Sequence, residues 1–488
     1  MHAYINDLNK VKQNGKIFIY GCGFGGITLK NYILATRPDI KIKGFIDTFK
    51  QGEADGLPIF ALKTFIDVNP QYDLILISSI HFNEIVYLLT KASISKYEIF
   101  FPENEQKKIT EISMMDKYKD APKILFICIA HSSHTVSWVT LLEKAKMNVR
   151  IFGVDNTMPP ENLGIQYYNF SKTFPDCAFK SKLERDWLAD VIAKWEPDII
   201  HTLGLYDASF IYLETLLKGK FEKKSKWIVT VRGGPELALN RLLKKERTKI
   251  KEVFETCDQL IADNMHNYEY AVKLGLNRKK ITPMGFVPGT GGINTGKALR
   301  PKKLPSEKEK IILWPKAYEC NASKAMPVIE ALKLCWNDIK PCKIIMTAVM
   351  PETILWFNTL PDEIKKSSRL YERVTRNKLM TLMKSARLLL IPSLSDGIPN
   401  TLYEAMSVGA YPIVSPLDTI LEFFSRRNCL FARNLYPQEI AKAIITGMTD
   451  DKLVDKGAIR NYNMVKKIAN REHIRNKVIS NYLDICEK

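Results

Sequence analysis

Two carboxylates separated by seven residues stand out in the segment SLSDGIPNTLYEAMSVGAYPIVS, which covers residues 393–415. Asp396 belongs to a polar loop, and Glu404 lies about a turn into a stretch that Pro399 and Asn400 are suited to start as a helix. Free backbone N–H groups at a helix start favour an anion. The arrangement therefore suits two polar contacts with a nucleotide sugar, one with the sugar and one with the ribose.

The elements around these carboxylates form a recognisable order. Residues 388–391 are an apolar run that predicts a strand, and Pro392 ends it. Residues 401–408 are compatible with a helix that Gly409 would stop, and residues 411–414 predict the next strand. A strand, loop, helix and strand in this order build a parallel crossover, in which ligands bind at the carboxyl ends of the strands.

Short apolar runs alternate with helical patterns along the whole chain, which predicts α/β architecture with doubly wound sheets. The length of 488 residues favours about three domains. We expect three Rossmann-like domains at residues 1–105, 122–300 and 301–488, with a linker at 106–121 and helices at the C-terminal end.

Composition limits the class of protein. No apolar run approaches the roughly 18 residues of a membrane span, and the first residues lack the apolar core of a secretory signal. The nine cysteines are dispersed without metal-ligand spacing, which is typical of reduced thiols in the cytoplasm. We therefore expect a cytoplasmic protein without a metal site.

The formal net charge of +19 comes with basic clusters at residues 218–226, 241–251 and 300–310. No nucleic-acid motif or aromatic platform accompanies them, so we expect no nucleic-acid partner. The positive charge could instead serve an anionic membrane surface on the cytoplasmic side, or an acidic or diphosphate substrate. A third explanation is that the lysine-rich surfaces are only solvated and bind no partner.

A glycine-rich turn follows the first predicted strand, residues 16–20. Gly21, Gly23 and Gly26 form G-x-G-x-x-G before a helical pattern, and Asp47 ends the next strand about 20 residues on. This pattern predicts a nucleotide or NAD site, although a structural domain could have kept the turn.

The segment around the two carboxylates resembles the donor-site motif of family 4 glycosyltransferases, retaining enzymes with the GT-B fold. There two glutamates bracket seven residues and the sequence continues E-A-M-x-x-G-x-P-V; this chain has Asp396 for the first glutamate, then Glu404-Ala-Met and Gly409-x-x-Pro-Ile. The resemblance covers about residues 121–488. It implies that the last two domains form the GT-B pair, acceptor side first, after an extra N-terminal domain.

The resemblance also implies roles in donor binding. Asp396 would orient the sugar and Glu404 the ribose, while Lys316 and Lys324 would neutralise the departing diphosphate. Both lysines could instead be surface charges. The other expected donor contacts are Val374 in a turn that faces the base, Gly397, Asn400 and Thr401 in the loop and helix start at the diphosphate, and Glu422, at a position where the family often has a glutamate.

On the acceptor side the resemblance points to His134 and His201, and Glu236, in the segment after Arg232, is a further candidate. His134 could instead cap its helix, and His201, placed at the end of its predicted strand, could instead be a hydrogen-bonded core residue. Arg232 stands where relatives often have a histidine near the reacting sugar. An arginine could hold the donor phosphate or an acidic acceptor, but it cannot act as a base.

The implied activity is transfer of a hexose-type sugar from a nucleoside-diphosphate sugar to a glycan or lipid-linked acceptor, as in surface polysaccharide or glycoconjugate biosynthesis. The resemblance implies retention of the anomeric configuration and no metal requirement. We expect a front-face mechanism, no cofactor requirement for the transfer itself, and, from the basic charge, a cytoplasmic enzyme that can associate with the inner membrane face. One alternative is a sugar oxidoreductase or epimerase centred on residues 21–26. Another is a non-catalytic scaffold, which Arg232 and Asp396 leave open.

Overall fold

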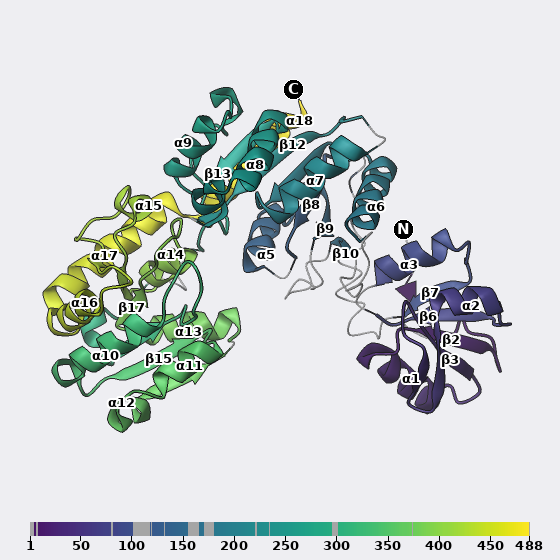
Figure 1. Cartoon of the computed structure of the whole chain (residues 1–488), viewed down its shortest axis with the longest axis horizontal. Helices are drawn as coiled ribbons and strands as arrows, with labels where there is room; N and C mark the ends of the chain where they lie inside the picture. The colour runs from purple at the N-terminus through teal and green to yellow at the C-terminus, as the bar shows by residue number, and fades with distance from the viewer. Residues whose placement is uncertain are drawn as a thin grey trace. The chain divides into compact units, whose positions relative to one another are not determined.

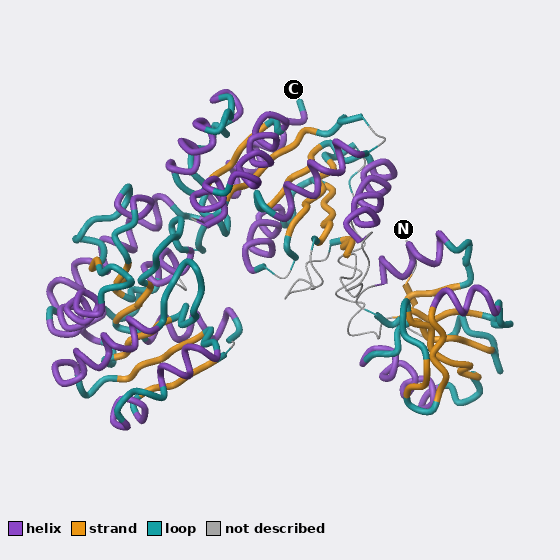
Figure 2. The backbone as a smooth tube through the Cα atoms, viewed as in Figure 1, coloured by secondary structure: helices purple, strands orange, loops and turns teal. Residues whose placement is uncertain are grey.

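The structure is a computed structural model, and it describes residues 4–5, 8–79, 82–100, 118, 120–130, 132–154, 165–169, 180–219, 222–233, 235–294, 301–372 and 374–487. The expected linker, 106–121, lies almost entirely outside these described residues. The chain divides into two compact units, one of residues 1–136, 146–203 and 211–225, the other of 137–145, 204–210 and 226–488. Figures 1 and 2 show the elements in each.

The N-terminal block is built on a seven-stranded sheet in the order β1-β7-β6-β2-β3-β5-β4. Its pairs are parallel except β4 with β5, a hairpin that the sequence did not predict. The elements are β1 Tyr4–Ile5, β2 Lys16–Tyr20, α1 Phe24–Thr36, β3 Lys41–Asp47, β4 Gly52–Ala54, β5 Leu57–Ala61, α2 Leu62–Val68, β6 Leu74–Ile77, α3 Phe82–Lys91 and β7 Tyr97–Phe100.

The second sheet has six strands in the order β10-β9-β8-β11-β12-β13. Its strands are β8 Lys123–Cys128, β9 Asn148–Gly153, β10 Gln166–Asn169, β11 Ile199–Leu203, β12 Lys226–Val231 and β13 Gln259–Ala262. Its helices are α5 Ser133–Val139, α6 Lys180–Trp195, α7 Asp207–Lys218, α8 Lys244–Thr256 and α9 Met265–Lys273, with short turns η1 Thr140–Leu142, η2 Pro235–Leu239, η3 Asn240–Leu242 and η4 Arg278–Lys280.

The third sheet is parallel throughout and has the order β16-β15-β14-β17-β18-β19. Its strands are β14 Ile311–Trp314, β15 Lys343–Thr347, β16 Ser368–Tyr371, β17 Leu388–Ile391, β18 Tyr411–Val414 and β19 Leu430–Phe431. Its helices are η6 Pro305–Glu307, α10 Met326–Ile339, α11 Pro351–Phe357, α12 Asp362–Lys366, α13 Arg376–Ser385, α14 Asn400–Ser407, α15 Asp418–Leu421, α16 Pro437–Thr449 and α17 Asp451–Ile468. The last helix of the chain is α18 Arg471–Cys486.

The apolar strands of the third sheet are buried on both faces. Ile312 and Trp314 pack with α10 and α16, whereas Ile311 and Leu313 pack with α13, α14 and α17 on the other face. Because successive side chains of β14 point to opposite faces of the sheet and both faces are buried, β14 is a continuous apolar run. The strand order reverses between β14 and β17, and ligands of such sheets bind at the carboxyl ends beside this reversal.

Three sheets with helical crossovers confirm the expected α/β, Rossmann-like fold class. The expected last domain, 301–488, includes α18, but side chains of α18 bond to residues of the expected second domain. The indole Nε1 of Trp138 lies 3.1 Å from the Tyr482 hydroxyl, and Gln259 exchanges hydrogen bonds with Asn481. Among the described residues, no helix has the length and apolar character needed to cross a membrane.

Candidate functional site

A lysine and an aspartate meet where the strand order of the third sheet reverses. Lys316 follows β14 and Asp396 follows β17, and the Lys316 Nζ lies 2.8 Å from the Asp396 Oδ2. Burial by itself lowers the pKa of Lys316, but the Asp396 carboxylate offsets this and the pKa is raised overall. Lys316 is therefore held as a cation at the carboxyl end of the sheet.

The second carboxylate of the motif is buried and paired. Glu404 lies on the second turn of α14, its side chain is 7% exposed, and its Oε1 lies 2.8 Å from the Nη2 of Arg376. Burial raises the pKa of Glu404, while Arg376 and Lys316 act against that rise. Arg376, the first residue of α13, directly follows the turn that contains Val374. No sequence pattern had singled out Arg376.

The start of α14 has no side-chain cap, because its N-cap residue is Pro399. The Oδ1 of Asn400 accepts a hydrogen bond from the Thr290 hydroxyl at 2.9 Å. The hydroxyl of Thr401 is buried and has no hydrogen-bond partner among the described residues. An uncapped helix start beside an unsatisfied hydroxyl suits an anion, as predicted for the diphosphate.

Side chains from distant segments hold this helix start. The Nη1 of Arg376 lies 3.4 Å from the Ser137 Oγ at the end of α5. Arg471, the first residue of α18, donates to the Ser137 and Thr290 carbonyl oxygens. Burial lowers the pKa of Arg471, and the charge of Arg376 adds to that effect. Arg471 thus connects α5 and α18 with Asn400 through Thr290, and Arg376 connects α5 with Glu404 directly.

A third carboxylate, which the sequence analysis missed, abuts the motif. Asp263 follows β13 and is only 5% exposed; its Oδ2 accepts the Gly233 N–H at 3.0 Å. Its Oδ1 accepts from the side-chain amides of Asn264 and Asn267, at 2.7 and 3.1 Å. Burial raises the pKa of Asp263 to about 7, and the nearby Asp396 charge contributes. The only signal in the sequence is an aspartate at a strand end, followed by two asparagines.

Gly397 is required by its contact with Asp263. A Cβ added at Gly397 would lie 2.5 Å from the Asp263 Oδ2 and 3.0 Å from the Gly233 Cα. Gly397→Ala should therefore destabilise the fold by about 1–3 kcal/mol and lower the thermal midpoint. Gly23→Ala is the control, since a Cβ there meets nothing within 4 Å. Equal midpoints for the two variants would show that this contact is absent.

The protonation of Asp263 should make stability depend on pH. Its pKa in the folded chain, about 7, lies above the ordinary 3.8, so the folded state binds the extra proton between these values. That contribution to stability is complete below about pH 4 and is lost as the pH rises through 7. We expect Asp263→Asn to reduce the fall in thermal midpoint between pH 5 and pH 8.

The matched control for this pH dependence is Asp484→Asn, which changes an exposed aspartate on α18. It should keep the wild-type difference between the two midpoints. If Asp263→Asn also kept the wild-type difference, the raised pKa of Asp263 would be contradicted.

The other predicted donor residues lie around this centre. Lys324 precedes α10 as expected, and its Nζ pairs with the Glu319 Oε1 at 2.7 Å. Its backbone N–H donates to the Asn434 Oδ1 at 2.9 Å. Glu422, at the end of α15, accepts the backbone N–H of Met265, and partial burial raises its pKa.

On the predicted acceptor side, Glu236 organises backbone. Its Oε2 accepts the Arg232 N–H at 2.7 Å, and its Oε1 accepts the Leu205 N–H. Burial raises the pKa of Glu236, while the Arg232 charge and these hydrogen bonds oppose the rise. Glu236 thereby joins the loop after β11 to the loop after β12 and fixes the backbone that carries Arg232.

The two predicted histidines belong to the other compact unit. His134 lies in the first turn of α5 and is partly buried. His201 was expected to end its strand, but β11 continues to Leu203. It is fully buried, with its ring centroid 5.3 Å from that of Phe126 on the neighbouring strand.

The glycine-rich turn and Asp47 come together in the N-terminal block. Gly21 has a φ of +101°, Gly23 is the N-cap of α1, and a Cβ at Gly26 would lie 1.9 Å from the Gly21 carbonyl oxygen. The Oδ2 of Asp47 accepts from the Cys22 thiol at 3.2 Å. Burial and this carboxylate raise the pKa of Cys22 to about 11.

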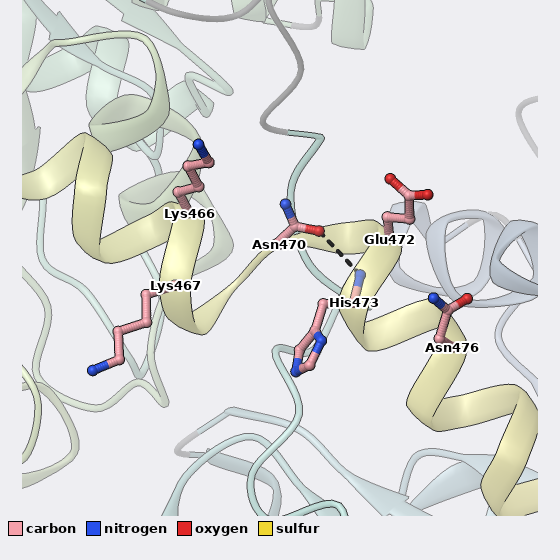
Figure 3. A pocket seen from close by; sticks show the side chains of 6 residues that line it. All are labelled: Lys466, Lys467, Asn470, Glu472, His473 and Asn476. Atoms are coloured by element: carbon pink, nitrogen blue, oxygen red, sulfur yellow. Dashed lines mark hydrogen bonds between the residues drawn. The ribbon is translucent and has the colours of Figure 1, made fainter.

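Two surface pockets contain none of the predicted site residues. One of about 450 Å³ lies where α17 gives way to α18, and there the Oδ1 of Asn470 caps the helix by accepting the His473 N–H (Figure 3). The other, of about 770 Å³, includes Lys16 and Lys96, at the amino ends of strands in the N-terminal sheet, opposite the glycine-rich turn.

Two family models match the chain. Residues 360–464 match glycosyl transferases group 1, and residues 123–264 match a glycosyl transferase 4-like model. A search of curated proteins gave no match.

Several solved structures are similar at low sequence identity. HepE of Anabaena in complex with UDP and glucose is 12% identical, with a TM-score of 0.58, over 74% of this chain and 100% of that one. Sucrose-phosphate synthase of Thermosynechococcus elongatus is 14% identical, with a TM-score of 0.59, over 74% and 99%. A candidate UDP-N-acetylglucosamine 2-epimerase of Listeria monocytogenes is 12% identical, with a TM-score of 0.54, over 74% and 95%. At these identities the likeness shows the fold.

Proposed function

We propose that this chain, a glycosyltransferase with the GT-B fold, transfers a hexose-type sugar from a nucleoside-diphosphate sugar to a glycan or lipid-linked acceptor. The observation that carries the proposal is the Lys316–Asp396 pair where the strand order reverses, 2.8 Å from Nζ to Oδ2. The pair lies at the carboxyl ends of β14 and β17, and Asp396 belongs to the loop that leads to the uncapped start of α14. A cation, sugar-binding carboxylate and anion-binding helix start are the groups that such a donor requires.

Each part of the donor has a candidate partner. The diphosphate would take the backbone N–H groups and Thr401 hydroxyl at the start of α14, with the charge of Lys316 nearby. Asp396 would orient the sugar and Glu404 the ribose hydroxyls, and the turn at Val374 would face the base. Lys324, Glu422 and Arg232 remain proposed contacts at the edge of this site.

The proposed reaction retains the anomeric configuration and requires no metal or cofactor. The C1–oxygen bond to the diphosphate breaks, and the acceptor oxygen bonds to C1 on the same face. The acceptor proton passes to an oxygen of the leaving phosphate. Lys316 and the helix start stabilise the negative charge that develops on the diphosphate, which is the main electrostatic demand of the step. We place the reaction in the cytoplasm because dispersed cysteines are typical of that compartment.

The donor class is supported by structures of the same fold. HepE has been solved with UDP-glucose as well as with UDP and glucose. The fold is also that of the candidate 2-epimerase, so fold alone does not separate transfer from epimerisation. The two glycosyl transferase models favour transfer.

The test is a panel of nucleotide sugars incubated with the full chain, with release of nucleoside diphosphate as the readout. We expect hydrolysis or transfer with one donor, and NMR of the released sugar should show the anomer of the donor. In an assay that contains both donor and acceptor, inversion of the donor sugar at C2 without net release of nucleoside diphosphate would indicate an epimerase instead. No turnover with any donor would favour the scaffold alternative.

A second, independent proposal concerns the N-terminal block as an extra nucleotide- or NAD-binding domain. The close approach of Gly26 to the Gly21 carbonyl and the position of Asp47 beside the turn favour it. Titration of the full chain with NAD tests it, with Asp47→Asn as the variant expected to weaken binding. Lack of any heat with NAD and with nucleoside monophosphates would favour a structural domain.

A further inference from the structure

Three exposed leucines lie together along the chain between β12 and α8. Leu239, at the end of η2, is 38% exposed; Leu242, at the end of η3, is 63% exposed; and Leu243 is 58% exposed. Burying an exposed leucine is favourable, so three within five positions indicate a partner that covers them.

Cations directly follow these leucines. Lys244, Lys245 and Arg247 occupy the first turn of α8, and all three are exposed. The positive end of the helix dipole lies at this turn, so the three charges cost the helix stability. Glu246, the acidic residue of the turn, forms a hydrogen bond with the Tyr206 hydroxyl. Local folding therefore gives no reason for the three cations.

The neighbouring basic residues differ, because each is placed on an aromatic ring. The guanidinium of Arg241 lies 4.1 Å from the Tyr270 ring centroid, and the Lys249 Nζ lies 5.2 Å from that of Phe210. These contacts are explained within the fold. We define the leucine–lysine face as the exposed residues that are not so explained: Leu239, Leu242, Leu243, Lys244, Lys245 and Arg247.

We propose that the leucine–lysine face docks on an anionic lipid membrane. Apolar side chains that enter the headgroup region and basic side chains that meet anionic lipids are the two signals that reversible membrane binding requires. Leucines offer nothing for the base stacking by which single-stranded nucleic acids bind, and a second copy would place lysine against lysine. An anionic lipid surface satisfies both halves of the face.

This inference goes beyond the transfer reaction, and it can fail independently of it. The binding assay contains no donor, and the transfer assay with a soluble acceptor contains no lipid. If both proposals hold, docking brings the enzyme to the surface where a lipid-linked acceptor is found.

The experiment is flotation of the full chain with vesicles of phosphatidylcholine containing 30 mol% phosphatidylglycerol, compared with phosphatidylcholine alone. The wild type should float with the anionic vesicles only. Lys244→Glu with Lys245→Glu should weaken binding at least about tenfold, since each lysine near such a surface contributes about fivefold. Leu242→Ser with Leu243→Ser should weaken it about tenfold.

Matched controls separate this face from the overall positive charge. Lys452→Glu with Lys456→Glu makes the same change in net charge at two exposed lysines of α17. Leu334→Ser with Leu355→Ser removes two leucines that are 55% and 61% exposed. Both controls should float as the wild type does, and all four variants should keep the wild-type thermal midpoint.

Three outcomes overturn the proposal. The first is a wild type that does not float with anionic vesicles. The second is a control pair that loses as much binding as its matched test pair. The third is single-stranded RNA binding by the wild type that the Lys244 and Lys245 substitutions abolish while flotation is unchanged, which would assign the cations to nucleic acid.

Discussion

Glu404→Gln should lower kcat/KM for sugar transfer by about 100-fold, with most of the change in KM for the donor. A hydrogen bond to a charged group contributes about 1.5–3 kcal/mol, and the buried carboxylate is the proposed acceptor for the ribose hydroxyls. The substitution also removes the charge that faces Arg376 at 2.8 Å. Steady-state kinetics with varied donor at fixed acceptor measure both effects.

Glu439→Gln is the matched control for Glu404→Gln. Glu439 also pairs with an arginine, Arg433, but its side chain is 37% exposed and it lies on α16. Its loss should leave kcat/KM near the wild-type value. A Glu404→Gln enzyme with a wild-type thermal midpoint, transfer rate and donor KM would contradict the role of Glu404.

Lys316→Met should lower kcat about 100- to 1,000-fold, the range observed when one preorganised stabiliser of a developing anion is removed. Lys316 is held as a cation next to Asp396, and the negative charge on the leaving diphosphate grows as the C1–oxygen bond breaks. Because the interaction is strongest in the transition state, kcat should change more than KM. Single-turnover measurements of diphosphate release report the chemical step.

The control is Lys343→Met, because Lys343 pairs with Glu309 at 2.7 Å on an exposed surface. It should leave kcat unchanged. Asp396→Asn separates binding from chemistry, since it should weaken affinity for the nucleotide sugar more than affinity for the free nucleoside diphosphate. A Lys316→Met enzyme with a wild-type kcat would show that other groups stabilise the leaving diphosphate.

The sequence predicted most inner strands of the three sheets and the edge strand β13, and it missed β1, β4, β5, β10, β16 and β19. Apolar strands such as 311–314 and 388–391 are buried on both faces, so their composition identifies them. The edge strands β16 and β19 are short and only partly buried. In the β4–β5 hairpin, β4 has only three residues, and β5 contains Pro58 and no fully buried residue, so neither shows the pattern of a buried strand.

The sequence identified several residues of the candidate site but not the side chains that contact them. Lys316, Asp396 and Glu404 follow from the family spacing, because local sequence encodes the loops after β14 and β17. Arg376 and Asp263 lie in other segments, and only the folded chain brings them to Glu404 and Gly397. Helical patterns likewise do not reveal which sheet a helix covers, so the contacts of α18 with Trp138 and Gln259 could not be foreseen.

Calorimetric titration of the full chain with UDP, GDP, ADP and dTDP tests directly whether the donor binds at the carboxyl ends of β14 and β17. We expect at least one of them to bind the wild type, Glu404→Gln and Lys316→Met to weaken this binding, and Asp47→Asn to leave it unchanged. Binding that survives the first two substitutions and is lost in Asp47→Asn would place the nucleotide in the N-terminal block. That result, or no binding of any of the four, would contradict a donor site at the carboxyl ends of β14 and β17.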